Sequence, residues 1–124
     1  MKPSLDENKP IFQQIREMIE DEIVNGTLTE EAQVPSTNQL VATYKINPAT
    51  VLKGFNQLVD NGILYKKRGV GMFVKSGARS KLIKKRKQAF KENYVRSMLQ
   101  EARKLGITEG ELQEMIKSIG GEIE

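Results

Sequence analysis

Two helix-start signals lie close together within residues 34–74 and constrain the fold more than any other feature of the chain. Ser36 is followed three residues later by Gln39, which is the spacing of a capping box, in which each side chain bonds the other residue's backbone N–H. The dipeptide Asn47-Pro48 combines a preferred cap with the residue favoured at the first helical position. The helix that begins at Ser36 has an apolar face through Tyr44, and only the short turn Lys45-Ile46 separates it from the second signal, so the sequence predicts a helix, a tight turn and a second helix.

A hairpin signal follows the second of these helices. Residues 63–67 and 72–74 predict two strands joined by the tip Arg68–Gly71, whose glycines permit a tight turn and close backbone approach to a phosphate. Cations gather at this tip: Lys66, Lys67 and Arg68. The order predicts a winged helix-turn-helix, mainly α with a small β-hairpin wing, a fold that most often places its second helix in the major groove of DNA. Lysines that only protect a sheet edge are the alternative for the tip.

Helical periodicity precedes this motif. Apolar residues recur at helical spacing over residues 11–23 and predict a first helix with Pro10 in its first turn and its end near Asn25-Gly26. We expect this apolar stripe to form core rather than a binding groove. Residues 1–9 are polar and are expected to fray, and residues 27–35 are expected to form a connector.

Two further helices are predicted after the wing. Beyond the hinge-like Ser76-Gly77, a long amphipathic helix runs until Gly106 ends it. A last helix begins at Thr108, where Glu111 completes another capping box. We therefore predict a C-terminal two-helix hairpin.

The apolar faces of these two helices predict a homodimer. Residues 79–124 number 46, too few to bury two such faces alone. We predict a winged helix-turn-helix domain at residues 1–75 and a helical dimerisation region at residues 76–124. The predicted dimer interface comprises Tyr94, Val95, Met98, Leu99, Ala102, Leu112, Ile116 and Ile119. The alternative is that both helices fold back on the first helix of their own chain.

The charge of the chain is unevenly distributed. Residues 45–104 carry 16 Lys and Arg against 3 Asp and Glu, a charge of +13, whereas the whole chain has a net charge of only +4. Such a basic segment suits a polyanionic partner. For residues 79–91 an ordinary solvated helix face is the alternative.

Composition excludes several classes of function. The chain has no Cys and no His, which excludes a disulfide, a Cys/His zinc site and histidine acid–base catalysis. The calcium pattern Asp-x-Asp-x-Asp-Gly is absent, so we expect no metal and no cofactor. No signal-peptide-like segment and no run of about 18 apolar residues occurs, so we expect a cytoplasmic protein without a membrane partner.

Small and polar residues lie opposite the apolar face of the third predicted helix. They are Ala49, Lys53, Asn56 and Gln57, with Thr50 on the flank. Such residues can approach base edges, whereas a protein-binding groove would require aromatic or aliphatic anchors. We therefore predict double-stranded DNA as the partner. A winged-helix module that binds an acidic protein is the alternative, and an enzyme is a third class, for which the scattered Glu and Lys offer no acid–base pair.

Motifs across both helix starts and the wing resemble the GntR family of bacterial transcription regulators. They are Pro35-Ser36, Asn47-Pro48-Ala49-Thr50-Val51 and Arg68-Gly69-Val70-Gly71-Met72-Phe73-Val74. The start of the third helix and the two-helix tail resemble the YtrA branch of that family, which has a short helical dimerisation region. The resemblance implies a dimeric repressor that binds an inverted repeat near its own promoter. In the YtrA branch the controlled genes often encode ABC transporters.

Pattern and resemblance together predict the DNA contacts, and the chain departs from the family at some of them. The predicted contacts are Ser36, Asn38, Asn47, Ala49, Thr50, Lys53, Gln57, Lys67, Arg68, Gly69 and Gly71. Asn38 and Leu52 stand where the family has arginines, and Asn47-Pro48 replaces its Ser-Arg helix start, so the preferred DNA sequence should differ. The tail is much smaller than the ligand-binding domains of other branches, and we predict no particular small-molecule effector.

Overall fold

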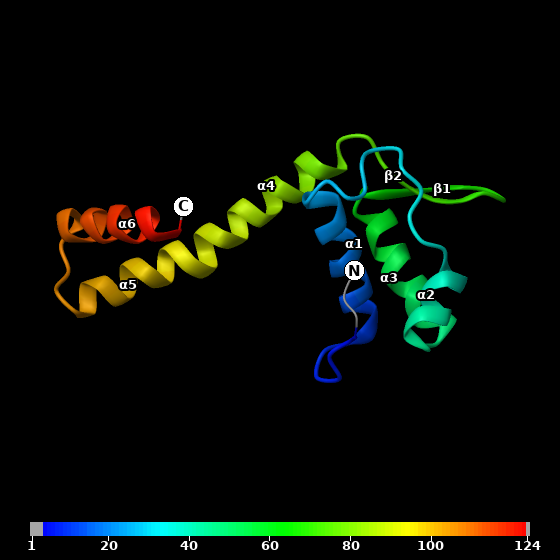
Figure 1. The fold of residues 1–124 in the computed structure, drawn as a ribbon, viewed down its shortest axis with the longest axis horizontal. Coiled ribbons are helices and arrows are strands. Elements are labelled where there is room, and N and C mark those ends of the chain that lie inside the picture. Colours follow the sequence, from blue (N-terminus) through cyan, green and yellow to red (C-terminus); the bar gives the residue numbers. More distant parts are fainter. Residues whose placement is uncertain (1–3, 124) are drawn as a thin grey trace. The chain divides into compact units, whose positions relative to one another are not determined.

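The computed structural model describes residues 4–123, so the predicted fraying of residues 1–3 lies outside the described part of the chain. The fold is mainly helical with one antiparallel hairpin, as predicted (Figure 1). Its elements in order are α1 (Ile11–Val24), α2 (Thr37–Tyr44), α3 (Pro48–Asp60), β1 (Leu64–Lys67), β2 (Gly71–Val74), α4 (Ala78–Phe90), the π-helical turn η1 (Lys91–Val95), α5 (Arg96–Lys104) and α6 (Glu109–Ile123). The chain divides into two compact units, of which the first ends at Lys84 and the second begins at Lys85.

The predicted helix starts are present with their hydrogen bonds. Ser36 Oγ accepts a 3.1 Å bond from the Gln39 N–H, and Gln39 Oε1 accepts a 2.7 Å bond from the Ser36 N–H. Thr108 and Glu111 bond one another in the same reciprocal way before α6. α1 starts one residue later than predicted, because Pro10 is its N-cap rather than its first helical residue. Reciprocal side-chain caps therefore set where α2 and α6 begin.

A close approach of α1 and α3 organises the core of the first unit. Gly54 allows it, because a Cβ at that position would lie 2.8 Å from the Phe12 carbonyl oxygen on α1. Side chains of these two helices, the wing and the start of α4 fill the core, among them Ile15, Ile19, Val51, Phe55, Leu58, Leu64, Val74, Ala78 and Leu82. Since Ala78 and Leu82 belong to this core, the first unit includes the first turns of α4, beyond the hinge-like Ser76-Gly77.

The connector between α1 and α2 is more ordered than its sequence suggested. It runs antiparallel beside β2: the Glu31 N–H donates to the Val74 carbonyl oxygen at 2.8 Å, and the Val34 N–H donates to Met72 at 3.0 Å. β2 thus has a backbone partner on both sides, because it also pairs with β1 in the register from Leu64↔Val74 to Lys67↔Gly71.

Part of the N-terminal segment is also tied down. Gln14 on α1 is buried, and its side-chain oxygen accepts a 2.7 Å bond from the Asp6 N–H. Its side-chain nitrogen donates to the Lys9 carbonyl oxygen at 3.0 Å. A buried amide must find partners, so the described residues before α1 fold over its start instead of fraying.

The second unit leaves much of its apolar surface exposed. Tyr94, Met98, Leu99, Ile116 and Ile119 of the predicted dimer interface are exposed, Val95 and Leu112 are half-buried, and Ala102 is buried within the chain. The predicted long helix is interrupted by η1, where the rings of Phe90 and Tyr94 lie 5.4 Å apart. Over residues 4–123, the helices are too short or too polar to span a membrane.

Candidate nucleic-acid interface

One side of α3 is solvent-exposed and faces away from the core. Its exposed residues recur at helical spacing and are Ala49, Leu52, Lys53 and Asn56. The buried residues Val51, Phe55 and Leu58 hold the opposite side in the core. Asn47 caps the helix, because its Oδ1 accepts a 2.8 Å bond from the Ala49 N–H. This cap and Pro48 fix the N-terminal turn, the part of a recognition helix that meets base edges.

Two of the predicted α3 contacts already have partners on α1. The Lys53 ammonium lies 4.0 Å from the centroid of the Phe12 ring, a cation–π contact worth about 0.5–1 kcal/mol at an exposed site. Gln57 is half-buried, and its Oε1 accepts a 2.7 Å bond from Arg16 Nη1. Thr50 is also half-buried. Lys53 would have to leave the ring to reach DNA, and Gln57 would have to leave Arg16.

The start of α2 offers groups suited to a phosphate. Ser36 and Asn38 are both exposed. Ser36 Oγ accepts the Gln39 N–H, which leaves its hydroxyl hydrogen able to donate. The N-terminus of a helix also favours anions, because its first backbone N–H groups point outward and the helix dipole is positive there.

The tip of the wing carries cations on a tight turn. The Val70 N–H donates to the Lys67 carbonyl oxygen at 2.9 Å and closes the turn, in which Gly69 has φ +77° and Gly71 has φ +145°. Both angles favour glycine. Arg68 is exposed beside them. The Lys67 ammonium lies 4.3 Å from the centroid of the Phe73 ring, so this cation is oriented over one face of the hairpin.

Lys67 lies over a pair of stacked aromatic rings, one of which carries an ionisable hydroxyl. The rings of Tyr65 and Phe73 stack with their centroids 5.9 Å apart. The Tyr65 hydroxyl donates to Glu31, and this hydrogen bond raises the pKa of Tyr65 above its ordinary value of 10.0. Tyr65 therefore stays neutral at physiological pH and adds no negative charge to the wing.

A groove of about 300 Å³ joins α2, α3 and the wing. It brings together three of the predicted contact residues, Ser36, Asn38 and Gly71. Leu52 of α3, Lys66 of β1 and Gln33 of the connector also line it, and none of these was predicted as a contact. Predicted residues outside its lining include Gln57 and Lys67, which bond or stack elsewhere.

Local sequence patterns indicated only weakly the three groove residues that were not predicted as contacts. Lys66 belongs to the predicted cationic tip, but strand alternation alone did not show which lysine faces the groove. Leu52 reads as another apolar residue of α3, although its position three after Ala49 places it on the exposed side. The position of Gln33 in the groove depends on its tertiary pairing with β2, which no local sequence pattern predicts.

The features of this surface are those of a binding site for a polyanion. Within residues 4–123, no group of three Asp or Glu side chains is arranged to hold a metal ion. The surface instead combines hydrogen-bond donors, exposed cations and an exposed helix face, which is the chemistry used to contact phosphates and base edges.

Comparison with known proteins identifies the family. The family model "Bacterial regulatory proteins, gntR family" matches residues 11–74, which span α1 to β2. The transcriptional repressor YtrA of Bacillus subtilis is 26% identical over 114 residues, covering 92% of this chain and 87% of YtrA. The uncharacterised regulator YurK of the same organism is 36% identical over 67 residues, but the match spans only 28% of its length and 54% of this chain.

Solved structures agree with this assignment. A putative GntR-family regulator from Bacteroides thetaiotaomicron has a TM-score of 0.77 and 31% identity, covering 92% of this chain and 99% of its own. YtrA from Sulfolobus acidocaldarius has a TM-score of 0.56 and 28% identity over 82% of this chain and 94% of its own. The DNA-binding domain of AraR, solved in complex with its operator ORE1, has a TM-score of 0.52 and 28% identity over 60% of this chain and 93% of its own. The chain therefore belongs to the GntR family of bacterial regulatory proteins, as a YtrA-like DNA-binding transcription regulator and not an enzyme.

Proposed function

We propose that the protein is a homodimeric, sequence-specific repressor that binds an inverted-repeat operator. The proposal is supported by the groove that the capped start of α2 and the cationic wing share with Leu52 on the exposed side of α3. Relatives named as repressors, YtrA among them, favour repression over activation. The resemblance to the YtrA branch extends the proposal to genes for ABC transporters, which genome-wide mapping of bound sites would test.

Each part of the surface has a role in this proposal. The N-terminal half of α3 enters the major groove and presents Ala49 and Lys53 to base edges. Ser36 and Asn38 at the start of α2 bond phosphate oxygens and fix the register of the protein on the duplex. Arg68 and Gly69 at the wing tip contact the neighbouring backbone, where the glycine permits close approach.

The homodimer is proposed from the apolar surface of the second unit. Tyr94, Met98 and Leu99 are exposed on η1 and α5, and Ile116 and Ile119 are exposed on α6. Large apolar side chains gathered on a small helical hairpin mark an interaction site. A second copy would bury them, and two joined copies would present two α3 helices to the two halves of an inverted repeat.

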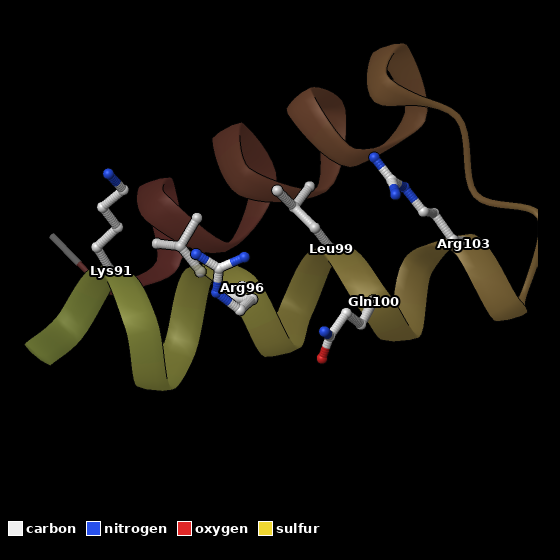
Figure 2. Close-up of a pocket in the computed structure, with 6 residues that line it drawn as sticks. Lys91, Arg96, Leu99, Gln100 and Arg103 are labelled. Carbon is white, nitrogen blue, oxygen red and sulfur yellow. The ribbon is translucent and has the colours of Figure 1, made fainter.

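Leu99 provides a direct test of the dimer. It lines a hollow of about 320 Å³ along η1 and α5 together with Val95 and cationic side chains, and it points away from Gln100 on the same helix (Figure 2). Replacing Leu99 with Glu would place a charge in the proposed interface, at a cost of several kcal/mol if the position is fully buried there. Ser97→Glu is the matched control, because residues two apart lie on different sides of a helix.

The experiment combines sedimentation with DNA binding. Leu99→Glu should sediment as a monomer that keeps a folded first unit, and it should lose most affinity for a duplex selected by the wild-type chain from a randomised library. Ser97→Glu should behave as the wild type in both measurements. A Leu99→Glu variant that stays dimeric would contradict the proposed interface. A wild-type chain that selects no preferred duplex, but binds an acidic protein tightly, would favour a protein-interaction module instead.

A further inference from the structure

Leu52 is a large apolar side chain on the exposed face of α3, where the other exposed residues, Ala49, Lys53 and Asn56, are small, cationic or polar. It keeps 43% of its surface exposed, whereas the core residues Val51, Phe55 and Leu58 of the same helix are almost fully buried. Its exposed neighbours at helical spacing are Ala49 and Asn56. A single exposed leucine is unremarkable on an arbitrary protein surface. This leucine, however, lies at the middle of the helix face that the proposed function inserts into DNA.

The surroundings of Leu52 are suited to a DNA strand. The same groove of about 300 Å³ is lined by Ser36, Thr37 and Asn38 from the start of α2 and by Lys66 from β1. Apolar side chains, among them Val34, Phe55 and Met72, form the rest of its lining together with Leu52. Hydroxyl, amide and ammonium groups are the donors that bind phosphate oxygens. Leu52 therefore lies next to groups that would hold a backbone, on the helix that would face the bases.

We propose that Leu52 contacts the 5-methyl group of a thymine in the major groove and so selects a T·A pair at one position of each half-site. This inference rests on the proposed function. Thymine alone among the four bases presents a methyl group in that groove. Against a purine, the leucine would cover the N7 acceptor without offering it a hydrogen bond, which is unfavourable. Against cytosine, it would lose the methyl contact.

The expected effect is small but specific. Burial of one methyl-sized group contributes a factor of about four in an equilibrium constant. Replacing the contacted thymine with uracil removes only the 5-methyl group and leaves the base pairing unchanged. Wild-type affinity should therefore drop about fourfold at that one position of each half-site, and truncation of Leu52 should abolish the response.

The test is a double-mutant cycle between protein and DNA. The probe is the duplex that the full wild-type chain selects from a randomised library, with each thymine replaced in turn by uracil. Wild type, Leu52→Ala and Leu52→Met are titrated against each duplex. We expect Leu52→Met to keep the methyl response and Leu52→Ala to lose it. Val70→Ala is the matched control, because it also shortens an exposed apolar side chain, at the wing tip rather than on α3. Circular dichroism verifies that each variant is folded.

Every outcome bears on the inference. Loss of the uracil response in Leu52→Ala alone would support it. Equal responses in wild type and Leu52→Ala at every thymine, or no response at any thymine, would overturn it while leaving sequence-specific binding intact. Failure of the wild type to select any preferred duplex would overturn both this inference and the proposed function.

Discussion

The side-chain nitrogen of Gln33 donates a 3.0 Å hydrogen bond to the carbonyl oxygen of Val70, and so ties the connector before α2 to the tip of the wing. Gln33 also forms an antiparallel bridge with Phe73 of β2. Its side chain packs against Gly71 so closely that a Cβ there would lie 2.6 Å from the Gln33 nitrogen. Since Gln33 precedes Ser36 by only three residues, it couples the wing tip to the start of α2.

Replacing Gln33 with Ala should weaken operator binding without unfolding the protein. The lost hydrogen bond is exposed, so the free energy of unfolding should fall by at most about 1.5 kcal/mol. If the bond orders the wing tip for DNA, affinity should fall by about the same free energy, which is roughly twofold to tenfold. Thermal unfolding and a binding titration measure the two effects. Gln13→Ala is the control, because the Gln13 amide bonds Glu17 within α1. Identical affinities for Gln33→Ala and wild type would show that the Gln33 hydrogen bond does not order the wing tip for DNA binding.

Binding should depend steeply on salt. Residues 45–104 carry a charge of +13, from 16 Lys and Arg and 3 Asp and Glu. If the protein neutralises about 6–10 phosphates, affinity should fall on the order of a thousandfold or more between about 50 and 200 mM salt. Titrations at several salt concentrations measure the slope. A flat response would argue against a duplex partner.

Gly54 should not tolerate alanine. A free helix gains up to about 1 kcal/mol from Gly→Ala, because glycine loses more backbone freedom on folding. At Gly54 the added Cβ would lie 2.8 Å from the backbone oxygen of Phe12, which can move only if α1 moves. We expect overpacking to dominate, with a loss of about 1–3 kcal/mol in the free energy of unfolding, measured by urea titration.

Gly121→Ala provides the contrasting variant. A Cβ at Gly121 on α6 meets no described atom within 4 Å, so helix propensity alone should act there. Its stability should be unchanged or higher. Equal or greater stability for Gly54→Ala would show that α1 and α3 are not held at this close distance.

The parts of the fold that depend on local chemistry were predictable from sequence. Ser36 and Asn47 determine where α2 and α3 begin through bonds to residues two or three positions away. The hairpin also follows from the glycines of its tip. In contrast, the pairing of the connector with β2 and the enclosure of Gln14 by the N-terminal segment join residues through tertiary contacts that no short pattern encodes.

Which residues of the candidate site are exposed could likewise be predicted only where helical spacing decides it. Helical spacing identified the exposed side of α3, including Ala49 and Lys53. It did not show that Gln57 bonds Arg16, because that contact requires α1 to cross α3 at a distance set by Gly54. Leu52 was noted only as a departure from a family arginine and was not predicted as a contact, although its position on the helix leaves it exposed.

Lys53 should distinguish base reading from simple charge attraction. It lies on the exposed side of α3, within two turns of the Asn47 cap, where a docked helix presents its side chains to base edges. If it contacts a guanine, Lys53→Ala should cost about 1–3 kcal/mol on the selected operator and relax the preference at one base position. The Phe12 contact of the ammonium opposes binding by no more than about 1 kcal/mol, so the base contact can still dominate.

Lys84 and Lys85 on α4 are the matched comparison, since both are exposed cations outside the helix-turn-helix. Replacing both with Ala should weaken the selected operator and a scrambled duplex alike, and should lower the salt slope by up to about two units. Titration of both variants against both duplexes separates the two effects. Equal losses on the two duplexes for Lys53→Ala would show that Lys53 contacts only phosphate. Base discrimination would then have to come from other residues of α3, such as Ala49 and Leu52, whose side chains are also exposed.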